Sequence, residues 1–282
     1  MNKNTGTLFV VATPIGNLDD MVPRAIEVLQ SVDLIAAEDT RRTGQLCSHF
    51  GIRTSLVAYH DHNEELQAQK LLTQLEEGKS IALVSDAGMP LISDPGYRVV
   101  RAVRDAQFEV IVIPGPCAAV VALAGSGLPT DRFQFLGFPP AKQQARQKWL
   151  SEFVQNVETL IVYESSHRIL NTLMDIEAVL GPSRQLAVAR ELTKTYETWL
   201  TGEASQVRAD VEQDPNQQKG EFVIVINGTD ESMSASEVEI TKYMGLMIAE
   251  MPLKKAAAIT AELLGVKKNE CYEVGLRLKE ST

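Results

Sequence analysis

The chain has 282 residues, of which 44% are hydrophobic and 23% charged, and its formal net charge is −10. It is longer than a typical single domain, its composition is that of a soluble globular protein, and no apolar run is long enough to span a membrane. A polar N-terminus and three scattered cysteines, Cys47, Cys117 and Cys271, argue against secretion and a disulfide framework, so we expect a cytoplasmic protein.

Apolar runs typical of strands alternate with amphipathic runs typical of helices through the first part of the chain. The expected strands are Thr7–Ala12, Asp33–Ala37, Ser55–Tyr59, Ile81–Val84 and Glu109–Ile113. Helical spacing over Pro23–Ser31 and Glu64–Glu77 separates some of them. This alternation predicts a mostly parallel sheet covered by helices, and we expect an N-terminal α/β domain over residues 1–115.

A second α/β domain is expected over residues 116–228, because apolar and helical runs continue to alternate there. The expected strands are Phe133–Phe138, Thr159–Tyr163, Gln185–Arg190 and Glu221–Ile226. Residues 228–236 are rich in Gly, Ser, Thr and acidic side chains, which is typical of a linker.

The last segment, residues 236–282, differs in kind from the rest. Ala and Leu recur at helical spacing over Pro252–Leu264, Gly265 breaks the pattern, and Lys267–Lys279 resumes it. This predicts a small helix-turn-helix-like appendage. A helical cap on a sheet or a dimer contact would give the same spacing, so all three interpretations stay open.

The loop after the strand at Ile81–Val84 carries the strongest local signal. It runs from Ser85 to Gly96 and places Asp86 and Asp94 among glycines and prolines. Small residues let a backbone approach a ligand closely, and the strand ends of a parallel sheet face a cleft. A tight connection in which the two aspartates cap a turn and a helix would explain the same residues.

Other loops of the first domain add to this signal. Thr13–Leu18 follows the first strand, where Pro14 fixes a turn and Gly16 presents backbone. Pro114–Ala119 opens a helix whose first N–H groups are free to bind a ligand. Neither a Gly-x-Gly-x-x-Gly nor a P-loop motif occurs, so dinucleotide and P-loop nucleotide binding are not indicated. The run His60–Asn63 offers two histidines without an obvious third ligand, so no metal is predicted.

Two strands of the second domain end in charged loops, Tyr163–Arg168 and Ala189–Lys194. Both loops fall where the wall of a cleft is expected. A helix start with capping serines, or a surface ion-pair patch, would explain either loop alone. Together with the strand-end loops of the first domain, they favour a shared ligand site.

The net charge is unfavourable for a general nucleic-acid binder, since phosphate binding relies on lysine and arginine. The charge is unevenly distributed, however. Six Lys and Arg against four Glu give Pro252–Thr282 a net charge of +2, so the rest of the chain has a net charge of −12. Any contact with RNA would be local, in this tail, at Lys142–Lys148 or at Arg41–Arg42. Solvated helix faces would explain the same clusters.

Taken together, the motifs resemble the tetrapyrrole (corrin/porphyrin) methylase superfamily over essentially the whole chain and, within it, the small-subunit ribosomal RNA ribose 2′-O-cytidine methyltransferases. The motifs that carry the resemblance are Thr13–Leu18, Ser85–Pro90, Ser93–Gly96, Pro114–Ala118, Tyr163–Ser165 with His167–Arg168, and Ala189–Lys194. Two positions depart from the family pattern: Met89 replaces a common threonine, and Ser166 replaces a common proline or threonine.

The resemblance implies two α/β domains with S-adenosylmethionine in the cleft between them, a small C-terminal helical appendage, and a homodimer. By position in the motifs, it also implies a set of cofactor-binding residues. These are Pro14, Gly16, Asp86, Ala87, Gly88, Leu91, Ile92, Pro114, Cys117, Ala118, Tyr163, Glu164 and Leu192.

The implied reaction is methylation of the ribose 2′-hydroxyl of a cytidine in the decoding region of small-subunit (16S) ribosomal RNA. Such a transfer needs alignment, exclusion of water, and a base or cation beside the weakly acidic hydroxyl. The charged candidates are Glu164, His167, Arg190, Lys194 and Glu197. Lys194 and Glu164 are the expected cation and carboxylate, with Arg190 as a third catalytic candidate, although structural ion pairs use the same residue types.

We expect small-subunit RNA as the partner, with neither DNA nor membrane, and the C-terminal appendage as part of the RNA contact. Two alternatives remain. In the first, the protein methylates a tetrapyrrole or a modified protein histidine with the same fold. The substrate that the purified protein accepts distinguishes this alternative from RNA methylation. A ribosome-assembly factor would keep RNA binding without chemistry, and cofactor binding without methyl transfer would identify it.

Overall fold

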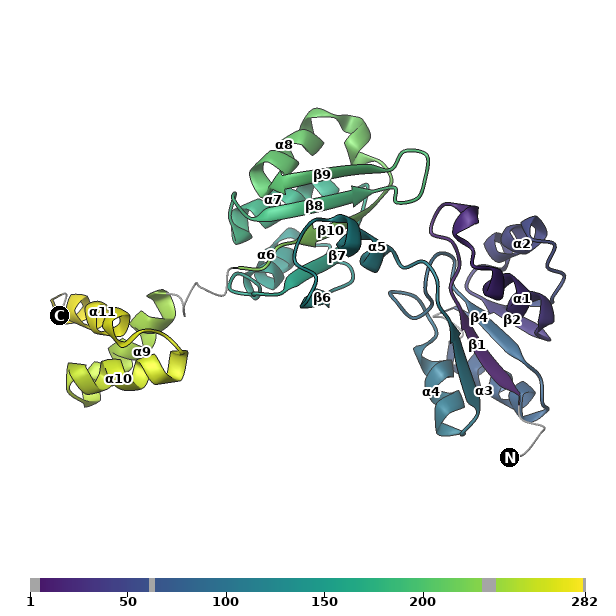
Figure 1. Cartoon of the computed structure of the whole chain (residues 1–282), viewed down its shortest axis with the longest axis horizontal. Coiled ribbons are helices and arrows are strands. Elements are labelled where there is room, and N and C mark those ends of the chain that lie inside the picture. The colour runs from purple at the N-terminus through teal and green to yellow at the C-terminus, as the bar shows by residue number, and fades with distance from the viewer. Residues whose placement is uncertain (1–5, 61–63, 230–236, 281–282) are drawn as a thin grey trace.

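The computed structural model describes residues 6–60, 64–229 and 237–280. It contains two five-stranded sheets followed by three helices, and Figure 1 shows these three parts one after another along the longest axis. Within the described residues, no helix is both long and apolar enough to cross a membrane.

The first sheet is parallel throughout and has the strand order β3-β2-β4-β1-β5. Its strands are β1 (Thr7–Val11), β2 (Leu34–Ala37), β3 (Leu56–Ala58), β4 (Ile81–Val84) and β5 (Glu109–Ile113). All four residues of β4 are buried, which explains why this strand is a continuous apolar run in the sequence. The five strands predicted here are confirmed to within one residue at either end.

Helices cover both faces of this sheet (Figure 1). One face carries α1 (Pro23–Ser31), which follows the short helix η1 (Leu18–Asp20), and α2 (Thr40–His49); the other carries α3 (Glu64–Glu76) and α4 (Tyr97–Asp105). Val99 and Val103, one turn apart on α4, are fully buried against this sheet. With both faces packed, the carboxyl ends of the strands are where a ligand can bind.

The second sheet is mixed and has the order β6-β7-β10-β8-β9, in which only β6 and β7 are parallel. Its strands are β6 (Phe133–Phe135), β7 (Thr159–Ser165), β8 (Gln185–Arg190), β9 (Thr198–Glu203) and β10 (Glu221–Ile226). The strand β9 is absent from the predicted set, because it is a half-exposed edge strand with little apolar content. The strand predicted over Phe133–Phe138 ends at Phe135, and Gly137 beyond it has a left-handed φ of +66°.

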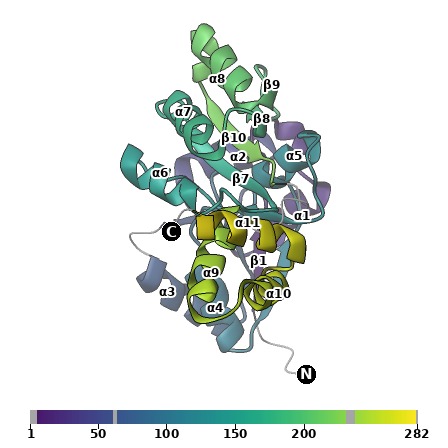
Figure 2. The same cartoon turned by 90° about the vertical axis from the view of Figure 1, so that its left-hand side faces the viewer.

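The helices of the second domain also lie on both sides of their sheet, as Figure 2 shows. One side carries α6 (Gln143–Ser151), α7 (Ile169–Leu180) and α8 (Ala204–Gln213), which η2 (Pro215–Gln218) follows; the other side carries α5 (Ala118–Gly125). Because α5 packs on the second sheet, we propose to divide the two α/β domains near residue 115.

The C-terminal unit consists of α9 (Glu237–Glu250), α10 (Leu253–Leu264) and α11 (Lys268–Glu280). Its buried residues, among them Met244, Ala257 and Cys271, form a core drawn from these helices alone. Gly265 ends α10 with a left-handed φ of +67°. The helices α10 and α11 are confirmed and α9 is an addition. Because its apolar residues pack on one another, the unit is not a cap on either sheet, and we propose a domain boundary near residue 228.

Candidate active site

A cavity of about 420 Å³ lies between loops from both α/β domains. The first domain contributes the loops that follow β1 and β4. The second contributes the start of α5, the loops that follow β6, β7 and β8, and the start of β10. The lining consists of Ile15, Ala87, Gly88, Met89, Ile92, Ser93, Asp94, Cys117, Ala118, Phe138, Tyr163, Glu164, Ser165, Ser166, Ala189, Leu192, Lys194, Gly220, Glu221, Phe222 and Val223.

Backbone contacts hold the first-domain wall of this cavity. The N–H of Thr13 donates to the oxygen of Gly88 over 2.9 Å, and the N–H of Gly88 donates back to Thr13 over 3.0 Å. Gly88 has a φ of +87°, and a Cβ there would stand 3.1 Å from Ile15. Leu91 and Ser93 also have left-handed φ angles, +74° and +66°, which cost free energy in residues with side chains. The wall is therefore a rigid, strained backbone structure.

Aromatic side chains from the second domain form the facing wall. Tyr163 accepts a hydrogen bond from the N–H of Ala119 over 3.1 Å, which ties β7 to the first turn of α5. Its ring makes edge-to-face contacts with Phe135 and Phe138, with centroids 4.8 and 5.6 Å apart. Burial raises the pKa of Tyr163 well above its usual value, so the phenol stays neutral at physiological pH. Phe138 is 56% exposed and borders the cavity.

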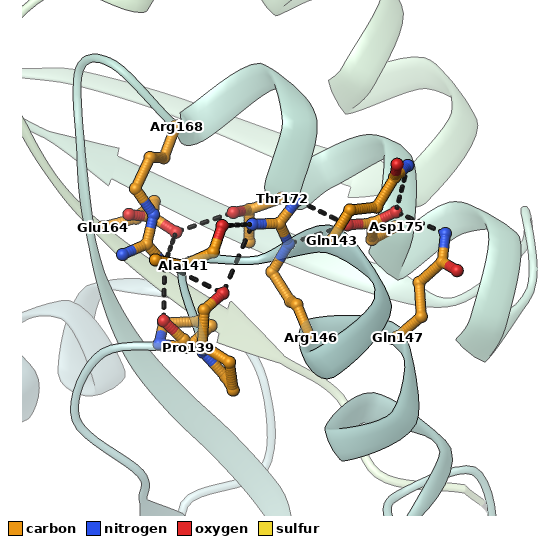
Figure 3. A network of polar contacts seen from close by, with 10 residues as sticks. Pro139, Ala141, Gln143, Arg146, Gln147, Glu164, Arg168, Thr172 and Asp175 are labelled. Carbon is orange, nitrogen blue, oxygen red and sulfur yellow. Dashed lines mark hydrogen bonds and ion pairs between the residues drawn. The ribbon is translucent and has the colours of Figure 1, made fainter.

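A network of buried charges holds the loop that follows Phe138 (Figure 3). Arg146 on α6 and Asp175 on α7 form an ion pair whose side chains are 3% and 1% exposed, with contacts of 2.6 and 2.7 Å. Arg146 also donates to the backbone oxygens of Pro140 and Ala141 over 3.4 and 3.3 Å. The pair therefore fixes the segment after Phe138 to the helices beneath it, and Arg146 belongs to the core instead of forming an RNA contact.

Glu164 is buried within the same network. Its carboxylate accepts hydrogen bonds from Thr172 over 2.6 Å, from Arg168 over 3.1 Å and from the N–H of Ser165 over 2.8 Å. Arg168 in turn donates to the oxygen of Pro139. Glu164 thus borders the cavity, but both carboxylate oxygens are engaged in holding loops in place.

Lys194 lies between two carboxylates. Its Nζ is 2.9 Å from Oε1 of Glu191 and 2.8 Å from Oε2 of Glu221. Partial burial lowers the pKa of Lys194, but the hydrogen bonds to Glu221 and Glu191 outweigh it, and the pKa is above its usual value. Burial alone would raise the pKa of Glu191. The hydrogen bonds from Lys194 and from the N–H of Glu221 lower it by more, so the pKa is below its usual value. Lys194 is therefore an ammonium group at neutral pH.

The loop that carries Lys194 contacts the first domain directly. The N–H of Asn17 donates to Oγ1 of Thr193 over 3.0 Å. A Cβ on Gly16 would stand 2.5 Å from Cγ of Lys194, which only a glycine avoids. Thr193 is itself left-handed, with a φ of +65° that is unusual for a β-branched residue. The two domains therefore meet at Gly16, beside Lys194, Glu191 and Glu221, which we call the Lys194 cluster.

Arg190 is placed differently from the expectation. It lines neither this cavity nor a second cavity that adjoins it. Its guanidinium donates to the backbone oxygens of Lys219 and Tyr196 over 2.6 and 2.9 Å, and to Thr198. Arg190 therefore ties together the segments around β8, β9 and β10.

The sequence-predicted cofactor residues divide into three groups. Most line the cavity described above: Ala87, Gly88, Ile92, Cys117, Ala118, Tyr163, Glu164 and Leu192. Pro14, Gly16 and Asp86 line a second, adjoining cavity, together with Ala87. Leu91 and Pro114 line neither, because Leu91 packs against the core beside Gly96 and Pro114 is exposed.

Sequence reasoning missed Phe138 and Glu221 as site residues. Phe138 lies in a Gly-Phe-Pro-Pro run just after a strand, a composition that marks a rigid loop with an aromatic at its tip. Glu221 begins β10 and resembles an ordinary exposed strand end in the sequence. Of the two histidines considered for a metal, His62 lies outside the described residues. Among the described residues, no group of three His, Cys, Asp or Glu side chains could hold a metal ion.

Residues 7–208 match the family model for tetrapyrrole (corrin/porphyrin) methylases, which is well over half of the chain. The chain belongs to this family. A second model, the RsmI C-terminal HTH domain, matches residues 234–279 and so covers the three-helix unit of this tetrapyrrole methylase.

Full-length relatives are similar in sequence as well. The chain is 52% identical over 275 residues to a ribosomal RNA small subunit methyltransferase I of Escherichia coli O157:H7, covering 98% of this chain and 96% of the relative. It is 50% identical to the protein of the same description from Haemophilus influenzae, with 98% of each chain covered.

Solved structures with much lower identity share the fold. A diphthine synthase superposes with a TM-score of 0.59 at 13% identity, covering 79% of this chain and 89% of the other. The methyltransferase CobJ superposes with a TM-score of 0.58 at 19% identity, covering 80% and 95%. The two-sheet arrangement is therefore shared with both of these structures.

Proposed function

We propose that this tetrapyrrole methylase transfers the methyl group of S-adenosylmethionine to the ribose 2′-hydroxyl of a cytidine in the decoding region of small-subunit ribosomal RNA. The observation that carries the proposal is the Lys194 cluster at the edge of a two-domain cavity, in a chain about half identical over nearly its whole length to small-subunit rRNA methyltransferases. The likeness in fold alone would leave the acceptor open.

The residues of the first cavity fit the cofactor. S-adenosylmethionine supplies, when bound, an electrophilic methyl group on a positively charged sulfonium. The cavity is lined by the carboxylates Asp94, Glu164 and Glu221 and by the ammonium group of Lys194. Because Glu164 is paired with Arg168, Asp94 and Glu221 stand against Lys194, and this balance favours a positively charged ligand. Small residues such as Ala87 and the neutral ring of Tyr163 offer space and an aromatic face for an adenosine.

The Lys194 cluster suits the activation of a hydroxyl group. Because Lys194 is charged at neutral pH, it cannot take the proton of the ribose hydroxyl, but it stabilises the negative charge that develops on the oxygen. The side chain of Glu221 is 81% exposed, borders both cavities and lies 2.8 Å from Lys194, so it is our candidate proton acceptor. In this assignment Glu164 and Arg190 hold the loops in place.

Methyl transfer to ribosomal particles tests the proposal. Small subunits from cells that lack this enzyme would be incubated with methyl-labelled S-adenosylmethionine, and the RNA digested to nucleosides. We expect the label in 2′-O-methylcytidine. Label on a porphyrinoid or on a protein acceptor, with none on the subunits, would contradict the proposal. Cofactor binding without any transfer would point to an assembly factor.

We assign the three-helix unit of residues 237–280 to RNA contact. It has its own core, and Lys254, Lys255, Lys267 and Lys268 place positive charge on it. Removing the chain after Thr229 should leave cofactor binding unchanged and weaken binding to the small subunit. Unchanged methylation of intact subunits by the shortened protein would remove the unit from RNA binding.

We further propose that the enzyme acts as a cytoplasmic homodimer. Large apolar side chains are exposed on three consecutive elements: Tyr97 on α4, Val112 on β5 and Val120 on α5. Such residues mark association surfaces when they form a continuous patch. The three cysteines are unpaired, which fits a reducing compartment. Light scattering during size exclusion tests the oligomeric state, and a mass of 31 kDa would contradict the dimer.

A further inference from the structure

A second cavity of about 360 Å³ adjoins the first one. It lies at the carboxyl edge of the first sheet, between the loop after β1, the loop after β4 and the helix α2. The two cavities share four lining residues, Ile15, Ala87, Lys194 and Glu221. The Lys194–Glu221 ion pair therefore lies on the boundary between two adjacent binding spaces.

The two cavities differ in charge. In the first, Asp94 and Glu221 outnumber the ammonium group of Lys194, because the third carboxylate, Glu164, is paired with Arg168. In the second, Arg42 and Lys194 balance Asp86 and Glu221. A polyanion such as RNA is repelled by the first set and tolerated by the second, whereas a sulfonium ion prefers the first. Charge thus distinguishes which reactant each cavity accepts.

Arg42 is placed to bind a phosphate at the rim of the second cavity. Its side chain is 69% exposed and lies 3.2 Å from Asp86, whose other oxygen accepts the N–H of Asp39 over 3.0 Å. An ion pair whose arginine is this exposed contributes little to stability. Exchanging Asp86 for a phosphate group therefore costs Arg42 little, and Asp86 keeps its backbone partner.

We propose that the second cavity is the subsite for the acceptor nucleotide. It takes one unpaired nucleotide of the RNA, with Arg42 on a flanking phosphate and the ribose 2′-hydroxyl at the boundary, beside Lys194 and Glu221. This inference rests on the proposed function, because it names where that function's substrate binds. Enzymes and RNA-binding proteins commonly read a base that is splayed out of its stack into a pocket.

Two variants test the subsite, and neither lies in the first cavity. Gln45 on α2 is exposed and lines only the second cavity, so Gln45→Trp fills the space without disturbing the core. We expect it to lower kcat/KM for small subunits by about 100-fold, while the Kd for S-adenosylmethionine, measured by calorimetry, changes less than twofold. Arg42→Ala should raise KM for the subunit by about tenfold, and Arg42→Lys should recover part of the loss.

Salt dependence gives a readout that a purely structural role would not change. If Arg42 contacts one phosphate, the slope of log affinity for the subunit against log salt concentration should fall by about 1 in Arg42→Ala. The matched control is Arg132→Ala, because Arg132 is an exposed arginine with an aspartate partner, Asp131, and lines neither cavity. The control should show the same salt-dependence slope and the same turnover as the unchanged enzyme.

The outcomes separate this inference from the proposed function. If the unchanged enzyme forms no 2′-O-methylcytidine, the proposed function fails. If the unchanged enzyme forms 2′-O-methylcytidine, and Gln45→Trp and Arg42→Ala methylate subunits equally well, the second cavity is not the acceptor subsite. A loss of S-adenosylmethionine affinity in Gln45→Trp would assign the second cavity to the cofactor and would also overturn the proposal.

Discussion

The two α/β domains hold their site loops by different means. In the first domain the backbone holds them, through the Thr13–Gly88 bridge and left-handed residues such as Leu91. In the second domain charged side chains hold them, chiefly the Arg146–Asp175 pair and the Arg168–Glu164 pair. One wall of the cavity therefore depends on glycine and backbone geometry, and the facing wall depends on ion pairs.

This difference explains why charged loops are ambiguous evidence for catalysis. The second domain offers several charged residues at strand ends, yet the hydrogen bonds of Glu164 and Arg190 go to residues that hold loops and strands in place. Lys194 alone among the three catalytic candidates borders both cavities. Substitutions can separate the charges that hold the fold from the charge of Lys194 at the boundary of the two cavities.

The largest effect is expected from Arg146→Ala. It leaves Asp175 as a buried charge without its ion-pair partner, which should reduce the free energy of unfolding by about 3–5 kcal/mol. Thermal unfolding should then show a Tm lower by about 10 °C. Arg208→Ala, which breaks the more exposed pair with Glu177, is the control, and its Tm should fall much less.

A double variant sharpens this test. Replacing the pair by Arg146→Met and Asp175→Leu removes both charges, so no unpaired charge remains buried, and part of the stability should return. If Arg146→Ala unfolds like the unchanged protein, the second domain does not depend on this ion pair and the contrast between the domains is lost.

Lys194→Ala should lower kcat by about 100-fold, which corresponds to about 2.7 kcal/mol, because a developing negative charge loses its cation. The Tm and the Kd for S-adenosylmethionine should stay nearly constant, unlike the result at Arg146. Lys194→Arg, which keeps the charge, should recover part of the rate. Single-turnover methylation of small subunits measures the effect, and normal turnover in Lys194→Ala would remove Lys194 from the mechanism.

Gly16→Ala tests the backbone side of the comparison. The added Cβ would stand 2.5 Å from Cγ of Lys194 and 2.8 Å from Oγ1 of Thr193. Relieving these contacts should cost about 1–3 kcal/mol of stability and should displace the Lys194 loop. Denaturant unfolding together with turnover measures both effects. An unchanged turnover would mean that the loop tolerates the displacement.

Cys117 provides a probe of the first cavity that needs no substitution. It borders the cavity, whereas Cys47 and Cys271 are buried, and burial raises the pKa of both of those thiols. A thiol reagent should therefore label Cys117 first, and saturating S-adenosylmethionine should slow that labelling by about tenfold. Labelling that is insensitive to the cofactor would place the cofactor outside this cavity.

The smallest expected effect is a gain in stability. Gly245 lies in α9 with nothing within 4 Å of the position of a Cβ, and its φ is not left-handed. Gly245→Ala should therefore stabilise the three-helix unit by about 0.5–1 kcal/mol through helix propensity. The expected change in stability is opposite in sign to that of Gly16→Ala. If both variants lose stability, the distinction between close-packed and open glycines fails here.

Much of the fold could be predicted from the sequence, because buried parallel strands such as Ile81–Val84 leave continuous apolar runs. The strand β9 could not, since as a half-exposed edge strand it lacks that pattern. Gly245 and several polar residues weaken the helical signal of α9. Local periodicity therefore finds elements that are buried in a regular way and misses those on an edge.

The site was predictable where motifs present backbone and unpredictable where partners decide the role. Gly88 and Cys117 border the cavity as their motifs indicate. The role of Lys194 depends on Glu221, which is 27 residues away in the chain and is brought close by the pairing of β10 with β8. Sequence spacing carries no information on such a contact, so Glu221 emerges only from the structure.

Left-handed residues that are not glycines occur in loops on both sides of the cavity, at Leu91, Ser93, Glu191 and Thr193. Each is an opportunity for protein engineering, because glycine at a left-handed position relieves strain of up to about 1 kcal/mol. A search for heat-resistant variants would therefore tend to select substitutions such as Ser93→Gly. Such variants would gain thermal tolerance at the expense of the fixed loop geometry on which turnover depends.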